Sequence, residues 1–312
     1  GPTPLRTGIE KSRNLMTIRV AQDVGMETIA DYAERFGVYK NMRPYLANSL
    51  GAEETTLYKM VAAYAMFANG GERVEPTLVD RIQDRYGKTV YRHDLRICNE
   101  CEKDNLSAGF GPEIISDRER IMDAITAYQL TSMMEGVVTR GTASRTVKLP
   151  VPAAGKTGTT NEAKDVWFVG FTSNIVAGCY IGFDIPAPLG RGTGGGSTCG
   201  PVFNEFMLAA TKKYGGGNFK VPDGGQFINL HRLTGDRLDQ NAEGDFVVAE
   251  YFRDGEEPTF GDAVNGGFAM GSNIDLYSEE DVQFIDTTSS EGAIVTFGGT
   301  ASLGTLTSGG LY

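Results

Sequence analysis

Three strand-like runs, each a few residues from the next, constrain this sequence more than any other feature. They extend over 154–160, 166–172 and 175–183, and the last two are joined by a tight turn at Ser173–Asn174. The second and third runs are apolar on both faces, which is typical of central strands that are covered on each side. The sequence therefore predicts a sheet that needs helices packed against it.

Helical periodicity supplies the elements that would cover this sheet. Helices are predicted over 12–36 (interrupted at Gly25, with its second part running from Glu27 to Gly37), over 55–69, from Arg118 to Thr139, and from Pro201 onward after a Gly-rich loop at 190–200. The apolar stripe of the 55–69 helix consists of Leu57, Met60, Val61, Tyr64, Phe67 and Ala68. The last helix carries inward-facing apolar residues at Phe203, Phe206 and Met207, and its last turn is basic, with Lys212 and Lys213. A hairpin is predicted over 78–91, and the fold class is α+β.

Charge divides the chain into two predicted parts. The net charge is −11, yet residues 223–312 alone hold 16 acidic and 3 basic side chains. A chain this acidic is not expected to bind nucleic acid. We predict one domain over 1–222, with a polar loop insertion at about 92–117, and an acidic Gly-rich extension over 223–312. Low hydrophobicity favours partial disorder there, although the islands at 246–248 and 294–295 could pair as short strands.

The start of the chain has no features of a leader or an anchor. No run approaches the roughly 18 apolar residues that cross a bilayer, and Gly1-Pro2-Thr3-Pro4 has neither part of a signal peptide. Since there is no initiator methionine, we expect the chain to begin inside a longer protein or after a tag.

Four cysteines allow several interpretations. Cys98 and Cys101 are predicted to form a local surface disulfide in an oxidising compartment, and two free thiols are the alternative. A structural zinc would need a second close pair, which Cys179 and Cys199, 20 residues apart, do not supply. Cys179 lies in an apolar run, so it is interpreted as a small buried residue.

The run Ala154-Gly155-Lys156-Thr157-Gly158-Thr159-Thr160 is the sharpest local motif. It is not a phosphate-binding P-loop, because Pro150 stands where that loop needs glycine and a strand follows where it needs a helix. As a strand, it places Lys156 and Gly158 on one face and Thr157 and Thr159 on the other. Glycine would let a peptide lie close, while the ammonium and hydroxyl groups would bind a carboxylate. The alternative is an ordinary strand end with a solvated lysine.

Lys156-Thr157-Gly158 resembles the K-T-G motif of penicillin-binding proteins and serine β-lactamases. The surrounding segments are similar, in order, to class A, bifunctional penicillin-binding proteins of the 1A type: Ser12-Arg13-Asn14 as the S-x-N motif, then residues 136–142, 165–171 and 181–184. The ending Gly309-Gly310-Leu311-Tyr312 is also similar. The resemblance extends over about residues 1–210. The S-x-x-K motif with its nucleophile is missing, because no serine here has a lysine three positions later.

The resemblance implies a penicillin-binding transpeptidase or serine β-lactamase-like sheet flanked by helices and N-terminally incomplete. The parent protein would be a D,D-transpeptidase that cross-links peptidoglycan stem peptides through a serine acyl-enzyme and binds β-lactams. Catalytic roles would fall to Ser12, Asn14 and Lys156, and substrate binding to Thr157, Gly158, Thr159 and Thr160. No metal or organic cofactor is implied.

The resemblance also implies a periplasmic protein, with an upstream glycosyltransferase domain and an inner-membrane anchor. This chain alone would be inactive, and the stripe of helix 55–69 would be partly exposed. A non-catalytic peptidoglycan-peptide binding or scaffold protein is the alternative from a different class. A β-lactamase would need the same missing serine.

Overall fold

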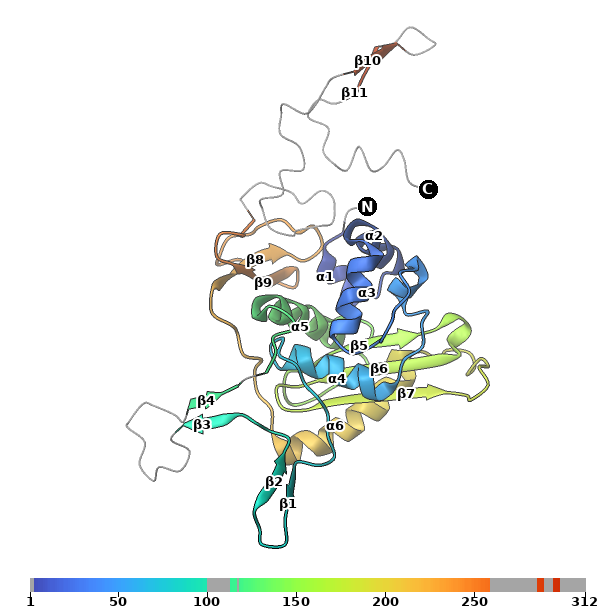
Figure 1. Ribbon diagram of the computed structural model, residues 1–312. Helices are drawn as coiled ribbons and strands as arrows, with labels where there is room; N and C mark the ends of the chain where they lie inside the picture. Colours follow the sequence, from blue (N-terminus) through green and yellow to red (C-terminus); the bar gives the residue numbers. More distant parts are fainter. Residues whose placement is uncertain (1–2, 100–112, 117, 259–284, 289–293, 298–312) are drawn as a thin grey trace.

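A three-stranded antiparallel sheet forms the centre of the molecule. In the computed structural model, which describes residues 3–99, 113–116, 118–258, 285–288 and 294–297, the sheet consists of β5 (Ala154–Thr159), β6 (Asp165–Phe171) and β7 (Val176–Gly182), in that order. The register pairs Lys156 with Val169 and Phe168 with Cys179. The three predicted strands are confirmed (Figure 1).

Short turns set the register of this sheet. Between β6 and β7, the amide of Thr172 donates to the carbonyl of Ile175 at 2.9 Å, as expected for a tight turn at Ser173–Asn174. Between β5 and β6, the 3-10 turn η2 (Asn161–Ala163) is closed by the amide of Asp165, which donates to Thr160 Oγ1 at 2.8 Å. Both connections are too short for any topology other than neighbouring antiparallel strands.

One face of the sheet is covered by α6 (Gly200–Tyr214), which follows the π-helical turn η3 (Gly195–Cys199). Phe168 packs on Phe203 with ring centroids 4.6 Å apart, and Met207 is fully buried. Pro201 and the two terminal lysines lie where the sequence placed them. The prediction for Phe206 is wrong, because its side chain is 57% exposed. Phe203 and Met207 are four residues apart and lie on the buried stripe of α6, whereas Phe206 lies beyond the edge of that stripe.

The opposite face is covered by α4 (Leu57–Ala68) and α5 (Ala124–Thr139). Phe171, Ala154 and Met134 form the buried cluster there, with Tyr64 of α4 against it. Because Phe168 and Phe171 are an odd number of residues apart on one strand, they belong to opposite faces. The central strand β6 is therefore covered on both sides, as predicted. For β7 the prediction is wrong in part, because β7 is an edge strand in the described sheet and only Cys179 of it is buried.

The residues of the predicted apolar stripe of α4 are half-buried, and the most buried residues of the helix lie next to this stripe. Leu57 and Val61 lie close to Gly178 of β7. Ala62, Ala63 and Met66 are buried instead, the last two with Phe36 and Ile121. The helix thus packs on two sides, against the sheet and against the N-terminal helices, which a one-stripe pattern does not reveal.

The N-terminal segment folds into helices that lie above the sheet in Figure 1: α1 (Leu5–Glu10), α2 (Asn14–Val24) and α3 (Met26–Arg35), followed by the 3-10 turn η1 (Leu46–Leu50). The predicted break at Gly25 is confirmed. Gly25 separates α2 from α3 with φ of +88°, in the left-handed region that glycine enters without strain. Ala21, Met26 and Ala30 form the buried contact between the two helices.

Two hairpins project between α4 and α5. The first, β1 (Arg81–Gln83) with β2 (Thr89–Arg92), is the predicted hairpin; the second pairs β3 (Ile97–Asn99) with β4 (Glu113–Ile115) inside the stretch expected to be loop. The α5 helix begins at Ala124 and not at Arg118, because Asp123 Oδ2 caps its first amides and Arg120 forms a bridge with Glu72.

A further hairpin, β8 (Gly225–His231) with β9 (Val247–Arg253), packs on α5. Tyr128 of α5 contacts Phe227 and Tyr251, and Gln129 Nε2 donates to the Tyr251 carbonyl at 2.8 Å. Of the first apolar island, 247–248 lie in β9, and the second island lies in β11 (Ile294–Phe297), which pairs with β10 (Ile285–Thr288). The strands β8 and β9 are ordered. Partial disorder elsewhere in the extension and the domain boundary at 222 and 223 stay predictions. No helix of the described residues has the length and hydropathy to cross a membrane.

Candidate active site

Lys156 and Ser12 meet although 144 residues separate them. Lys156 is the third residue of β5, on the α5 side of the sheet, and Ser12 lies in the short loop between α1 and α2. The Nζ atom of Lys156 donates to Ser12 Oγ at 2.7 Å and to the carbonyl of Thr157 at 3.0 Å. The structure thus brings together two of the three residues predicted to be catalytic.

The Ser12 loop is held in a conformation that serine rarely adopts. Ser12 has φ of +52°, in the left-handed region, which costs a non-glycine residue about 1–3 kcal/mol. The loop is fixed on both sides of this residue. The Arg13 amide donates to the Gly8 carbonyl of α1 at 2.9 Å, and Lys11 Nζ donates to the Arg140 carbonyl at 2.8 Å. The loop is therefore docked on the end of α5 and presents the Ser12 hydroxyl to β5.

Burial makes Lys156 an unusual lysine. Its side chain lies between the sheet and the helices on the α5 side, and this desolvation lowers the pKa of Lys156 from 10.5 to about 8. At neutral pH the ammonium form still dominates, but the neutral amine is accessible within about one pH unit. The group can therefore hold an anion when charged and accept a proton when neutral.

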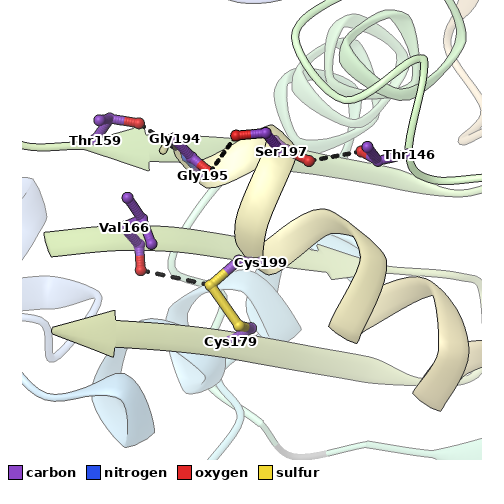
Figure 2. Close-up of a disulfide and its surroundings, with 9 residues drawn as sticks. Thr146, Thr159, Val166, Cys179, Gly194, Gly195, Ser197 and Cys199 are labelled. Atoms are coloured by element: carbon purple, nitrogen blue, oxygen red, sulfur yellow. Dashed lines mark hydrogen bonds between the residues drawn. A yellow bond between two sulfur atoms is a disulfide. The ribbon is translucent and has the colours of Figure 1, made fainter. Parts of the chain in front are cut away.

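The threonine side of β5 is built from neutral groups. Thr157 Oγ1 and Thr142 Oγ1 share a hydrogen bond of 2.7 Å, and the amide of Gly195 donates to Thr159 Oγ1 at 2.9 Å. Figure 2 shows Thr159 beside Gly194 and Gly195, and Thr146 bonded into the same turn. A Cβ on Gly195 would overlap the carbonyls of Trp167 and Gly158, so only glycine allows η3 to lie this close to β5. The predicted alternation of lysine and threonine faces is confirmed.

The other predicted site residues lie around this centre. Asn14 is the first residue of α2, exposed and two residues after Ser12. Gly158 lies against Trp167 of the neighbouring strand, where an added Cβ would be 3.1 Å from the Trp167 Cβ. Thr160 is engaged elsewhere: its hydroxyl accepts from the Asp165 amide and closes the β5–β6 turn. A substrate contact of Thr160 stays a prediction, and its hydroxyl is already used in this turn.

A disulfide between Cys179 and Cys199 lies beneath the threonine side (Figure 2). The prediction that Cys179 is buried is confirmed, whereas its pairing with Cys199 was not predicted. The two cysteines are brought together because η3 crosses β6 and β7, which places Cys199 over Cys179. The bond fastens the last residue of η3 to β7, while Gly195 at the start of η3 contacts Thr159 of β5. Cys98 lies in β3, but Cys101 falls outside the described residues, so their pairing stays a prediction.

Several contributing residues were missed by sequence reasoning. Thr142 and Thr146 follow α5 without any motif that signals a hydroxyl cluster, although Thr142 ended one of the family-like segments. Glu10, adjacent to the S-x-N motif, is fully buried and accepts from Arg140 Nη2 at 2.6 Å. An acidic residue beside a candidate motif was the signal available for it. The described residues contain no group of three or more histidine, cysteine or acidic side chains arranged to hold a metal ion.

Comparison with known proteins assigns this chain to a family. The model of the penicillin-binding protein transpeptidase domain matches residues 1–208. Penicillin-binding protein 1A of Rickettsia bellii is 45% identical over 237 residues, which cover 75% of this chain and 30% of that protein. The corresponding protein of Pseudomonas aeruginosa is 31% identical over 305 residues, covering 88% of this chain and 37% of that protein.

A solved structure gives the same answer for the fold. The crystal structure of penicillin-binding protein 1A from Haemophilus influenzae superposes with a TM-score of 0.66 at 30% identity, over 82% of this chain and 40% of that one. The sheet is that of a transpeptidase-type domain. The chain belongs to the penicillin-binding protein transpeptidase domain family. It spans 30% and 37% of the length of the two curated relatives named above.

Proposed function

We propose that this chain supplies part of the active site of a peptidoglycan D,D-transpeptidase, which cross-links stem peptides through a serine acyl-enzyme. The observation that carries the proposal is the 2.7 Å hydrogen bond from Lys156 Nζ to Ser12 Oγ, within a transpeptidase-family sheet. It joins the two motifs that the resemblance assigned to catalysis. In the parent protein the same site would be acylated by β-lactams.

Each group has a chemical task in this proposal. The nucleophilic serine attacks the carbonyl of the penultimate D-alanine, and the C–N bond to the terminal D-alanine breaks. Ser12 relays a proton to the departing amine, and Lys156 supplies positive charge beside Ser12 and near the terminal carboxylate. A second stem peptide's amine then attacks the acyl-enzyme, which releases the serine and forms the cross-link.

Substrate placement falls to β5 and to α2. Thr157 and Thr159 would donate hydroxyl protons to the terminal carboxylate, and the Thr159 amide would be one donor to the developing oxyanion. Gly158 would let the donor peptide lie along the strand, and Asn14 would hold its amide. The Thr157–Thr142 and Thr159–Gly195 hydrogen bonds support this assignment, because they fix the two hydroxyls before a substrate arrives.

The nucleophile is expected from outside these 312 residues, since no serine of the sequence has a lysine three positions later. We infer that the parent is a periplasmic enzyme with a membrane anchor and a glycosyltransferase domain, and that this chain is inactive by itself.

The test is intact-mass spectrometry after incubation with benzylpenicillin, on this chain and on a version extended upstream to the next Ser-x-x-Lys. We expect one covalent adduct on the extended chain and none on the 312-residue chain. An adduct on the shorter chain would disprove the assignment of the nucleophile. A folded extended chain without an adduct would contradict the proposed function and would favour a peptide-binding scaffold, which binds D-Ala-D-Ala peptides reversibly and in a salt-sensitive way.

A further inference from the structure

The β8–β9 hairpin contacts the N-terminal helix α1 through a buried ion pair and through a hydrogen bond from Thr7 Oγ1 to the Arg232 carbonyl at 3.3 Å. Arg6 of α1 is 3% exposed, and its guanidinium is bound in two places by Glu250 of β9, through Nε to Oε1 and through Nη2 to Oε2, the latter at 2.6 Å. The same guanidinium donates to the carbonyl and the hydroxyl of Ser132 in α5, at 2.8 and 2.7 Å. Arg6 therefore joins three elements, of which β9 is the most distant in sequence.

A chain of charges continues from Arg6 toward Ser12. Arg6 Nη1 lies 3.8 Å from Glu10 Oε1, and Arg140 Nη2 lies 2.6 Å from the same oxygen. The backbone of Glu10 is fixed as well, because its carbonyl accepts from the amide of Thr142 at 3.1 Å. Glu10 is two residues before Ser12, so whatever holds Glu10 holds the start of the Ser12 loop.

Burial makes this chain of charges sensitive to the loss of one member. Arg6 and Glu10 are 3% and 0% exposed, and the Glu250 side chain is 13% exposed. A buried charge that loses its partner is strongly unfavourable, whereas a surface ion pair contributes little. Without Glu250, Arg6 would keep its two hydrogen bonds to Ser132, but among the described residues the one carboxylate left within 4 Å would be Glu10, which is already engaged by Arg140. The response that costs the least free energy is a shift of α1 that exposes Arg6 to water.

We propose that Glu250 is a positioning residue that holds α1, and through it the Ser12 loop, in place opposite Lys156. It touches neither Ser12 nor Lys156 and acts through Arg6 and Glu10. Its meaning for catalysis rests on the proposed function, but its effect on the loop does not. A segment predicted to lie outside the transpeptidase domain would then be needed to shape that domain's site.

Hydrogen exchange and lysine titration on the 312-residue chain test this directly. The variant is Glu250→Gln, which keeps the shape and removes the charge. The control is Arg253→Ala on the same strand, which removes an exposed ion pair with Asp123 at 2.7 Å that has no connection to α1. In Glu250→Gln, we expect the amides of Arg13 and Thr142 to exchange at least about tenfold faster and the pKa of Lys156 to rise from about 8 toward 10.5. Arg253→Ala should change neither.

The proposal is overturned if Glu250→Gln matches Arg253→Ala in both measurements. If Glu250→Gln loses protection throughout β8 and β9, Glu250→Asp decides instead, because it keeps the charge on a shorter side chain. In Glu250→Asp, faster exchange of the Arg13 amide with an intact hairpin would support the proposal, and unchanged exchange of that amide would overturn it. Neither measurement needs substrate or the nucleophile, so a negative benzylpenicillin result would leave this outcome readable.

Discussion

The two sides of β5 are built in different ways. On the lysine side, a cation lies half-buried against the Ser12 loop, and that loop is fixed by the ion pairs of Arg6, Glu10 and Arg140. On the threonine side, hydroxyls bond to a glycine turn that a disulfide fastens to the sheet. The lysine side draws on partners far apart in the sequence, while the threonine side is built from residues 142–207. Placing a charge in a low-dielectric site costs more free energy than placing neutral hydroxyls. Here the partners that support the charged side are also the more distant ones in the sequence.

Phe203→Ala is expected to have the largest effect, and it should break the threonine side. Phe203 is 2% exposed and supports Phe168 under β6, so we expect a loss of about 3–5 kcal/mol in the free energy of unfolding. Phe206→Ala, on the same helix but 57% exposed, is the matched control and should cost less than about 0.5 kcal/mol. Urea unfolding followed by circular dichroism measures both, and similar losses would show that α6 is oriented differently.

Removing the disulfide should be next in size. The double variant Cys179→Ala, Cys199→Ala releases η3 from the sheet, and we expect it to cost about 2–4 kcal/mol. Thermal unfolding under oxidising conditions measures this loss. In this variant, hydrogen exchange should accelerate more at the Gly195 amide than at the Arg13 amide, because the lysine side does not depend on this disulfide. Equal acceleration at both amides would contradict the independence of the two sides.

Lys156→Met should stabilise the fold at neutral pH. The folded-state pKa of about 8 lies below the ordinary value of 10.5, so below pH 8 the folded chain carries the full cost of charging a buried lysine. That cost falls as the pH rises from about 8 to 10.5, where lysine becomes neutral in the unfolded chain too. We expect a gain of about 1–3 kcal/mol at pH 7 that declines across this interval.

The control for this variant is Lys164→Met, which removes an exposed lysine paired with Glu162. It should change the free energy of unfolding by less than about 1 kcal/mol at any pH. Unfolding curves recorded between pH 6 and pH 11 test the pair, and a loss of stability in Lys156→Met at pH 7 would show that Lys156 is not held at a cost.

Thr157→Val has the smallest expected effect on stability. It removes the hydrogen bond to Thr142 Oγ1, for which we expect a loss of about 1 kcal/mol. A double-mutant cycle with Thr142→Val isolates the pair, because the second substitution should add little once the first has been made. Fully additive losses would mean that the two hydroxyls do not interact.

The central sheet and the helices were predictable because their signals are local. Alternation assigned Lys156 and Thr157 to opposite faces, and Gly25 marked the break between two helices. Ser12 and Lys156 were paired by family resemblance, since no local rule connects residues so far apart. The Cys179–Cys199 bond depends on a helical turn crossing two strands, and Phe206 depends on where the buried stripe of α6 ends. These features are set by tertiary packing, which periodicity does not encode.

Average composition did not locate the ordered strands within the acidic segment. The acidic segment after residue 222 contains β8 and β9, whose inward residues include Ile228, Leu230 and Phe252. Their burial is local and is hidden by the average over a long acidic stretch. Glu250 contributes to that acidity, yet it is one of the charges that bind the hairpin to α1.

The measurement that tests the Lys156–Ser12 contact most directly is the titration of the Lys156 side chain by NMR, with the chain labelled at lysine and Lys156→Met used for assignment. A pKa near 8 is expected, because the half-buried side chain of Lys156 is desolvated between β5 and the Ser12 loop. An ordinary value near 10.5 would mean that Lys156 is solvated, and the charged side of the proposed site would not exist as described.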